Sequence, residues 1–359
     1  MNVVNYLIDN KDVPLRKLPF NELDALLFSL AAYFPFGLIK KNKINAKLLL
    51  KFLKTYEPTL TTKRKLLDIF ILTNICLGKR YKGIRFDFFN KKFDKQFHEQ
   101  FQAITIKLKD FVFISFSGTD GTLTGWREDL NMSFLDIVPA EISASRYANF
   151  IRKKYPFKKI YIGGHSKGGR LAIRAASDLE KKKKLAGIFS FDGPEFNSSF
   201  YENQNYIDIA HLIHRYTPFE SIFGRLINNQ DSRVIVDSYA ELLLQHDAYT
   251  WEVEDDHFVT VDFYSDRSTE LLGVINTLFN ELSPETKNIL IDTIFDFLEK
   301  RKDEMEEDVN FSIASFFKQQ WASKPKEVKS LLIKVTLKYL REVIILIRLI
   351  KDIMTPSDY

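Results

Sequence analysis

Two patterns of hydrophobic and polar positions alternate along this chain. Stretches with apolar residues at helical spacing are separated by short, nearly continuous apolar runs, which are typical of buried strands. This alternation predicts an α/β fold, a sheet whose strands are joined by right-handed helical crossovers. The expected helices are Asn21–Tyr33, Asn45–Leu53, Thr62–Leu77 and Ala140–Tyr155, and the expected strands are Ala103–Leu108, Phe111–Ser117, Lys159–Ile162, Ala186–Phe191, Ile207–Tyr216 and Val234–Val236, with Tyr249–Val253 and Phe258–Phe263 pairing at an edge.

The pattern divides the chain into two parts. Residues 1–263 are expected to form one domain, with a helical N-terminal part (1–100) and a part that carries the sheet (101–263). Residues 264–359 form an all-helical C-terminal extension. Its last predicted helix, Leu331–Met354, is charged on one narrow face and apolar elsewhere. So wide an apolar face needs a cover, and the body of the protein, a second copy in a homodimer and a peripheral membrane contact all stay open.

Composition narrows the class of protein only moderately. The 359 residues are 45% hydrophobic and 14% aromatic, which is ample for a large core. The net charge of +5, from 52 Lys and Arg against 47 Asp and Glu, is mild for this length and favours no nucleic-acid partner. The single cysteine, Cys76, leaves no intramolecular disulfide and fits a reducing compartment. Because charged residues interrupt the N-terminus where an export signal would be apolar, we expect a cytoplasmic protein.

The most informative motif is the run from Gly164 to Gly168, which reads Gly-His-Ser-Lys-Gly. It follows a β-prone run and precedes an Ala-rich helix, the context in which G-x-S-x-G forms a nucleophile elbow. A serine on such a sharp turn leaves no room for side chains two residues away, and both flanking positions are glycine. The turn also directs the first N–H groups of the following helix toward an oxyanion. The sequence therefore predicts Ser166 as a nucleophile.

Further motifs carry a resemblance to known families. The run Phe113–Asp120, followed by Gly125-Trp-Arg-Glu-Asp-Leu130, resembles the oxyanion loop and W-x-x-D-L element of class 3 lipases. The chain is more similar still to the Mbeg-like proteins, a bacterial lipase-like family of unknown function. Their G-H-S-K-G-G, F-D-G-P, S-I-x-G and Q-H-D elements correspond here to Gly164–Gly169, Phe191–Pro194, Ser221–Gly224 and Gln245–Asp247.

The resemblance covers about Met1 to Phe263 and implies an α/β-hydrolase-type sheet flanked by helices. Two positions depart from the expected patterns. Ser117 stands where the lipases usually carry arginine, which affects how the oxyanion loop is braced. Glu195 stands where the family more often has glycine, at the rim of the expected pocket.

A serine nucleophile needs a histidine base and an acid that orients it. Four histidines follow Ser166. His211 and His214 lie in an apolar strand-like run and His257 in a turn, whereas the resemblance places the family's histidine at His246. The resemblance implies Glu220 as the acid, with Asp192 as the alternative, while Asp237 and Asp247 stay open.

The remaining site residues follow from the elbow and from the lipase resemblance. Lys167 is expected to donate its backbone N–H to the oxyanion, and Thr119 is the second donor that the resemblance implies. His165 is expected to be structural. We predict no metal, because His211-x-x-His214 lacks the further ligands of a zinc site, and no cofactor, because no nucleotide-binding fingerprint is present.

Together these residues predict a serine hydrolase that cleaves carboxylic esters of small molecules or lipids through an acyl-serine intermediate. The same residues would serve a thioesterase or an acyltransferase, since a fold does not fix the substrate. The alternative is a weakly active or non-catalytic hydrolase-fold protein that binds a partner or a membrane surface through its C-terminal helices.

Overall fold

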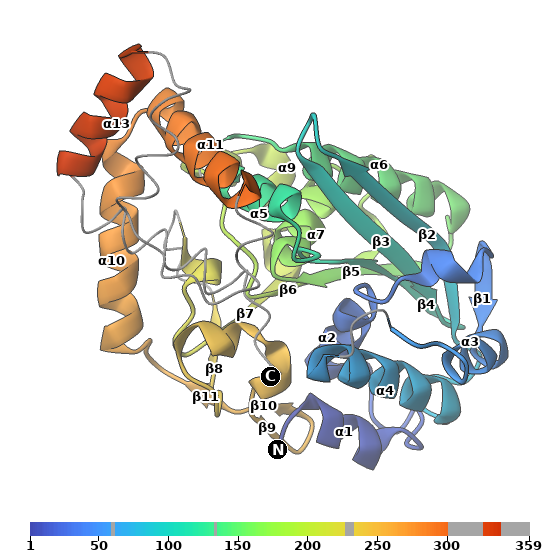
Figure 1. The fold of residues 1–359 in the computed structure, drawn as a ribbon. Helices are drawn as coiled ribbons and strands as arrows, with labels where there is room; N and C mark the ends of the chain where they lie inside the picture. Colours follow the sequence, from blue (N-terminus) through green and yellow to red (C-terminus); the bar gives the residue numbers. More distant parts are fainter. Residues whose placement is uncertain (59–61, 133–134, 227–232, 301–325, 339–359) are drawn as a thin grey trace.

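A mixed nine-stranded sheet forms the centre of the protein (Figure 1). The computed structural model describes residues 1–58, 62–132, 135–226, 233–300 and 326–338. Within these residues the strand order is β1-β2-β3-β4-β5-β6-β7-β8-β11. The strands are β1 Lys43–Asn45, β2 Arg85–Asp94, β3 Glu99–Lys107, β4 Phe111–Phe116, β5 Lys159–His165, β6 Leu185–Phe191, β7 Ile213–Pro218, β8 Val234–Val236 and β11 Thr260–Val261.

The sheet is parallel in the middle and antiparallel at both ends. Strands β4 to β8 pair in parallel, whereas β1 to β4 and the edge pair β8–β11 are antiparallel. A small separate pair joins β9 (Val253–Glu254) to β10 (His257–Phe258). The carboxyl ends of the parallel strands therefore lie at one edge, where open α/β sheets place their binding sites.

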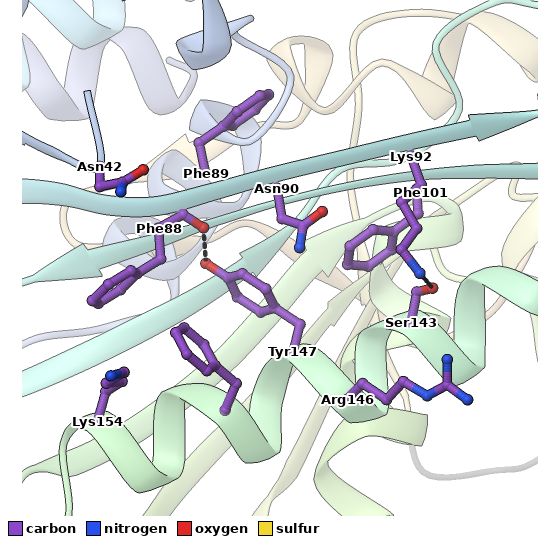
Figure 2. Close-up of a pocket in the computed structure, with 11 residues that line it drawn as sticks. Asn42, Phe88, Phe89, Asn90, Lys92, Phe101, Ser143, Arg146, Tyr147 and Lys154 are labelled. Atoms are coloured by element: carbon purple, nitrogen blue, oxygen red, sulfur yellow. Dashed lines mark hydrogen bonds between the residues drawn. The ribbon is translucent and has the colours of Figure 1, made fainter. Parts of the chain in front are cut away.

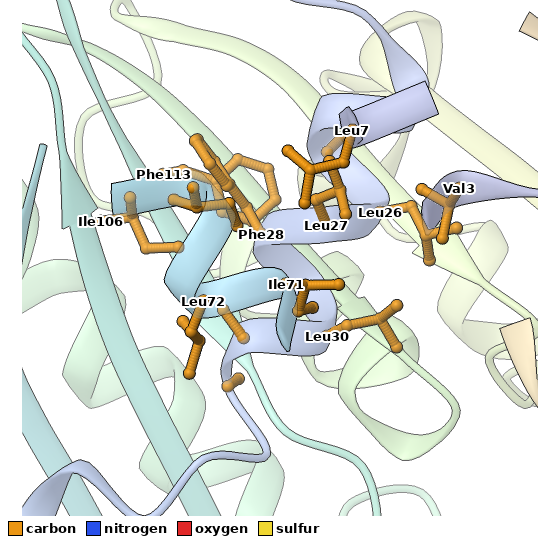
Figure 3. Close-up of a cluster of buried hydrophobic side chains, with 14 of the residues drawn as sticks. Val3, Leu7, Leu26, Leu27, Phe28, Leu30, Ile71, Leu72, Ile106 and Phe113 are labelled. Carbon is orange, nitrogen blue, oxygen red and sulfur yellow. The ribbon is translucent and has the colours of Figure 1, made fainter. Parts of the chain in front are cut away.

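Helices cover both faces of this sheet (Figure 1). One face packs against α1 (Val3–Asn10), α2 (Glu22–Ala31) and α4 (Lys63–Leu77), and the other against α6 (Pro139–Lys154) and α7 (Lys167–Ser177). Strand β4 serves both cores, because Phe113 faces the first and Ile114 the second. Figure 3 shows the first core, in which Leu27 and Phe28 of α2 pack beside Phe113. The predicted α/β fold with helices on both faces is confirmed.

Polar N-caps begin the N-terminal helices at the positions that the sequence predicts. Asn21 caps α2, Asn45 caps α3 (Ala46–Leu53), and Thr62 caps α4, each through its side-chain oxygen. Asp24 completes a capping box with Asn21 and is itself fully buried. Its carboxylate accepts hydrogen bonds from the Arg80 guanidinium at 2.5 and 2.8 Å, which ties α2 to the segment after α4.

Two expectations about the strands were wrong, and a third, the pairing of Tyr249–Val253 with Phe258–Phe263, holds only at Val253 and Phe258. The run Ile207–Tyr216 is not one strand, because α9 (Gln204–Ile207) and a 3-10 turn (Ala210–Leu212) precede β7. The N-terminal part is also not wholly helical, since β1 and the long strand β2 belong to it. The outer half of β2 is exposed and rich in lysine, so it lacks the apolar alternation that would have predicted a strand. At the opposite edge, Tyr249–Val253 contributes only the start of β9, and β11 pairs with β8.

The remaining α-helices of the described residues are α5 (Leu123–Asn131), the short α8 (Ser198–Tyr201) and, in the C-terminal part, α10 (Asp266–Glu281), α11 (Pro284–Lys300) and α13 (Lys326–Lys338). The Arg127 guanidinium of α5 forms an ion pair with Asp292 of α11, and the two helices pack side by side (Figure 1). The predicted helix Leu331–Met354 lies outside the described residues beyond residue 338. Within the part of the chain that the structure describes, no helix combines the length and apolar character needed to cross a bilayer.

Candidate active site

Ser166 lies on a strained turn between the end of β5 and the start of α7. Its backbone has φ 58° and ψ −135°, a left-handed φ that is uncommon for a residue with a side chain. A Cβ added to Gly164 would overlap the backbone of Gly168, and one added to Gly168 would overlap the carbonyl of Phe116. The two glycines therefore allow the close approach of strand and helix that this turn needs.

His246 lies between Ser166 and Asp192. Its Nε2 is 2.9 Å from Ser166 Oγ, and its Nδ1 is 2.5 Å from Asp192 Oδ2. An ionised carboxylate can only accept, so Nδ1 carries the proton and Nε2 is left to accept from the serine hydroxyl. The segment after β8, far from Ser166 in sequence, thus brings the imidazole into hydrogen-bonding contact with the hydroxyl.

Asp192 follows directly after β6 and is held by the segment 221–224. Its backbone is left-handed, with φ 51°, and its side chain is buried. The carboxylate Oδ1 accepts from the Ser221 hydroxyl at 2.5 Å and from the Gly224 N–H at 3.1 Å. These bonds leave Oδ2 directed at His246, and they give the S-I-x-G element a structural purpose.

Glu220, the first choice for the acid, does not contact His246. Its carboxylate accepts instead from the Leu242 N–H at 2.7 Å and from the Ser265 hydroxyl at 3.1 Å. It holds together the loops on either side of the histidine, a task that a carboxylate performs as readily as orienting an imidazole. The alternative, Asp192, is the residue that the geometry favours.

Asp237 and Asp247, the other two candidates for the acid, bond to groups other than His246. The Asp247 carboxylate pairs with the Arg64 guanidinium at 3.3 Å. Asp237 accepts from the N–H of the next residue, Ser238, at 2.8 Å. The ring nitrogens of His246 bond instead to Ser166 and Asp192, so neither of these acids orients the imidazole.

The loop after β4 lies against the serine. A Cβ on Gly118 would approach Ser166 Cβ to 3.0 Å. The residue just before Thr119 therefore lies directly against Ser166. The Thr119 hydroxyl donates to the Asp129 carboxylate, which orients the loop from α5. Lys167 is the first residue of α7, where backbone N–H groups have no partner inside the helix. The structure thus brings both expected oxyanion donors to the serine's side of the sheet.

The Lys167 side chain adds a buried ionic cluster beneath this loop. Its ammonium is 3.1 Å from Glu128 and 3.5 Å from Asp129, and it donates to Gln100 at 2.6 Å. Burial opposes the ammonium charge, but the two carboxylates outweigh it and raise the Lys167 pKa. Burial raises the pKa of both carboxyl groups, and Lys167 counters that rise. One cation therefore holds two neighbouring acids of α5 against the start of α7.

Comparison with family models identifies the family of this chain. A profile of the Mbeg1-like family matches residues 75–296, which is more than half of the chain. The chain belongs to the Mbeg1-like family. No match was found among curated proteins.

Among solved structures, the Mbeg1-like chain is distantly similar to fungal lipases. Lipase II from Rhizopus niveus has a TM-score of 0.39 at 15% identity, covering 60% of this chain and 77% of that one. The lipase from Rhizopus microsporus var. chinensis has a TM-score of 0.36 at 16% identity, covering 63% and 74%. The Rhizomucor miehei lipase–propeptide complex has a TM-score of 0.34 at 15% identity and is matched over 43% of this chain and 57% of its own length.

Sequence reasoning missed the support that His165 and Phe223 give to the site of this Mbeg1-like protein. His165 is buried; its Nδ1 accepts from the Tyr33 hydroxyl at 2.9 Å, and its Nε2 donates to the His246 carbonyl at 2.7 Å. The centroid of the Phe223 ring lies 4.4 Å from that of the His246 ring. No local sequence pattern predicts these contacts, because they join segments that are far apart in sequence. The structural role expected for His165 agrees with its position.

The other histidines lie away from the serine. His211 and His214 are exposed, and His214 stacks on Phe189 with ring centroids 5.0 Å apart. His257 lies exposed at the start of β10. Within the described ranges, no group of three or more His, Cys, Asp or Glu side chains could hold a metal ion.

The buried His165 leads to a prediction about stability and pH. Burial, with smaller effects from His246 and Arg64, lowers the His165 pKa well below the usual 6.5. The unfolded chain therefore binds a proton below about pH 6.5 that the folded protein does not, and stability falls as pH drops, by up to about 1.4 kcal/mol per pH unit. In urea unfolding between pH 5 and 8, His165→Gln should show a shallower decline than the native protein.

Comparing the native protein with His165→Gln separates the effect of His165 on the pH dependence from the effects of other groups. Burial raises the pKa of Asp68 to about 6, which opposes the trend equally in both proteins. The exposed His257 gives the matched control, because His257→Gln should leave the slope unchanged. Parallel curves for the native protein and His165→Gln would contradict the prediction.

Proposed function

We propose that this protein is a serine hydrolase that cleaves carboxylic esters through an acyl intermediate on Ser166. The observation that carries the proposal is the position of His246, hydrogen-bonded to Ser166 Oγ on one side and to Asp192 on the other. This arrangement places a nucleophile, a base and an orienting acid in a hydrogen-bonded row, as ester hydrolysis by a serine enzyme requires. The proposal needs no cofactor.

The proposed reaction proceeds in two halves. Ser166 Oγ attacks the ester carbonyl while His246 Nε2 takes the hydroxyl proton, and Asp192 stabilises the imidazolium that forms. The Lys167 and Thr119 N–H groups are the proposed donors to the oxyanion. The imidazolium then protonates the leaving alcohol, which departs. Water attacks the acyl carbon while His246 Nε2 takes its proton. The bond between the acyl carbon and Ser166 Oγ then breaks, the imidazolium returns the proton to Oγ, and the carboxylic acid is released.

Labelling with a fluorophosphonate, which reacts with activated serines, tests the proposal directly. The native protein should be labelled, Ser166→Ala should not be labelled at all, and His246→Ala should react far more slowly because the hydroxyl loses its base. The exposed Ser199 on α8, outside the proposed catalytic set, provides the control Ser199→Ala, which should label like the native protein. Equal labelling of the native protein and Ser166→Ala would refute a role for this serine.

Hydrolysis of a panel of p-nitrophenyl esters with graded acyl chains then distinguishes an esterase from other uses of the fold. We expect turnover of at least one ester, with loss of turnover in Ser166→Ala. Labelling without turnover of any ester would favour the alternative of a weakly active or non-catalytic hydrolase-fold protein.

A further inference from the structure

A cavity lies on the side of the sheet that carries β2 and β3, away from the proposed catalytic residues. It has a volume of about 460 Å³ and opens between the β2–β3 ribbon and helix α6 (Figure 2). Cavities of this size hold small molecules in many proteins. None of the described residues that line it belongs to the proposed catalytic set, so an inference about this cavity stands apart from the proposed function.

The floor and one wall of the cavity are aromatic. Phe101 and Tyr147 are buried beneath it, whereas Phe150 is 42% exposed. The rings of Phe88 and Phe150 meet edge to face with centroids 5.4 Å apart. The exposed Phe150 ring and the half-buried Phe88 ring together form an apolar surface at the cavity, which an apolar group would remove from water.

The charged residues around these rings are cationic. Lys92, Arg146 and Lys154 line the cavity, and its described lining contains no carboxylate. Lys92 is already paired, since its ammonium lies 3.8 Å from the Glu99 carboxylate. Arg146 and Lys154 are exposed and form no ion pair among the described residues, and the Lys154 ammonium lies 5.3 Å from the centroid of the Phe150 ring. The charge at the rim is therefore suited to an anion, with the aromatic rings next to it.

The backbone at the cavity is strained in a way that shapes it. Phe88 has φ 58°, a left-handed conformation that is costly for an aromatic residue, and it lies at a bulge in the β2–β3 pairing. The Tyr147 hydroxyl donates to the Phe88 carbonyl at 2.8 Å (Figure 2). The Phe88 N–H donates to the Asn42 carbonyl at 2.9 Å. Two bonds from opposite sides thus hold the Phe88 ring at the cavity.

We propose that this cavity binds an amphipathic anion with a single apolar chain, of the chemistry of a medium-chain fatty-acid carboxylate. The chain lies on the half-buried Phe88 ring and the exposed Phe150 ring, where it removes apolar surface from water. The headgroup lies at the rim beside Lys154, whose ammonium is next to the Phe150 ring, and Arg146 adds a second positive charge farther along α6. Neither cation has an ion-pair partner among the described residues. An uncharged chain alone would leave both cations unused, and a small inorganic anion would leave the rings uncovered.

Calorimetric titration with decanoate, below the concentration at which it forms micelles, tests the headgroup. Reversing both rim charges, with Arg146→Glu and Lys154→Glu together, should weaken decanoate binding by about tenfold or more. The matched control is Lys183→Glu with Lys184→Glu, which changes the net charge equally at two exposed lysines outside the cavity. The control should bind as the native protein does, and decan-1-ol should bind more weakly than decanoate.

A fluorescent reporter tests the location. Phe150→Trp puts an indole at the mouth of the cavity, and decanoate should change its emission over the same concentrations that calorimetry reports. Phe157→Trp, at a position that is 89% exposed and outside the cavity, should show no such change. The proposal is overturned if decanoate does not bind, if both charge-reversed proteins bind it equally, or if the reporter at Phe150 does not respond.

Discussion

Replacing Asp192 with asparagine should lower kcat/KM for ester hydrolysis by about 10⁴-fold while the fold persists. The new side-chain amide keeps an oxygen for Ser221 and Gly224 but presents an N–H₂ group to His246, which favours the wrong tautomer and removes the charge that stabilises the imidazolium. Steady-state kinetics on the best p-nitrophenyl ester measures the effect, and circular dichroism checks the fold.

Glu220→Gln is the matched comparison, because it removes the charge of the neighbouring buried carboxylate. Its amide oxygen can still accept from the Leu242 N–H, so kcat/KM should stay within a few-fold of the native value. The reverse ranking, with Glu220→Gln inactive and Asp192→Asn active, would show that the histidine takes its acid from Glu220 during catalysis.

Lys167→Met should destabilise the protein by about 3–5 kcal/mol, the cost of leaving buried charges without their partner. The Lys167 side chain is fully buried between Glu128, at 3.1 Å, and Asp129, at 3.5 Å. A methionine fills similar space but leaves the two carboxyl groups facing one another. The free energy of unfolding in urea gives the measurement.

Lys153 on α6 offers the control for that experiment. Its ammonium is 3.2 Å from Glu180, nearly the same separation, but the two side chains are 69% and 57% exposed. Exposed pairs of this kind contribute about 0–1 kcal/mol, so Lys153→Met should have little effect. If both substitutions cost the same, burial is not what makes the Lys167 cluster important.

The elbow was predictable from sequence because its constraints are local. Gly164 and Gly168 must be glycine for a turn formed by a few consecutive residues, and strand and helix flank that turn directly. His246 was found only through a family motif. The identity of the acid could not be read from the sequence, because Asp192 and Glu220 both follow parallel strands near the same edge. Asp192 reaches the imidazole because its left-handed backbone and the bonds that its carboxylate accepts from the segment 221–224 orient it.

The strand errors have a similar physical origin. Strand β2 is stabilised by pairing with β3 rather than by its own apolar residues, so its exposed outer half carried no strand pattern. The run from Ile207 onward is apolar enough for a strand, but Asn203 caps a helical turn there, and regular pairing with β6 begins only at Ile213. At β2 a tertiary pairing overrides what the local pattern favours, and after Asn203 a local cap does so.

The segment that carries His246 is hydrogen-bonded to the N-terminal part of the chain. The Asn2 amide donates to the Tyr249 carbonyl across 247 positions, and the Tyr249 hydroxyl donates to Asp68 across 181. Contacts between such remote positions form late in folding, since they must close very long loops. During synthesis, the serine turn therefore leaves the ribosome well before its base can be anchored. The proposed catalytic set is therefore complete only after the last strands of the sheet have been synthesised.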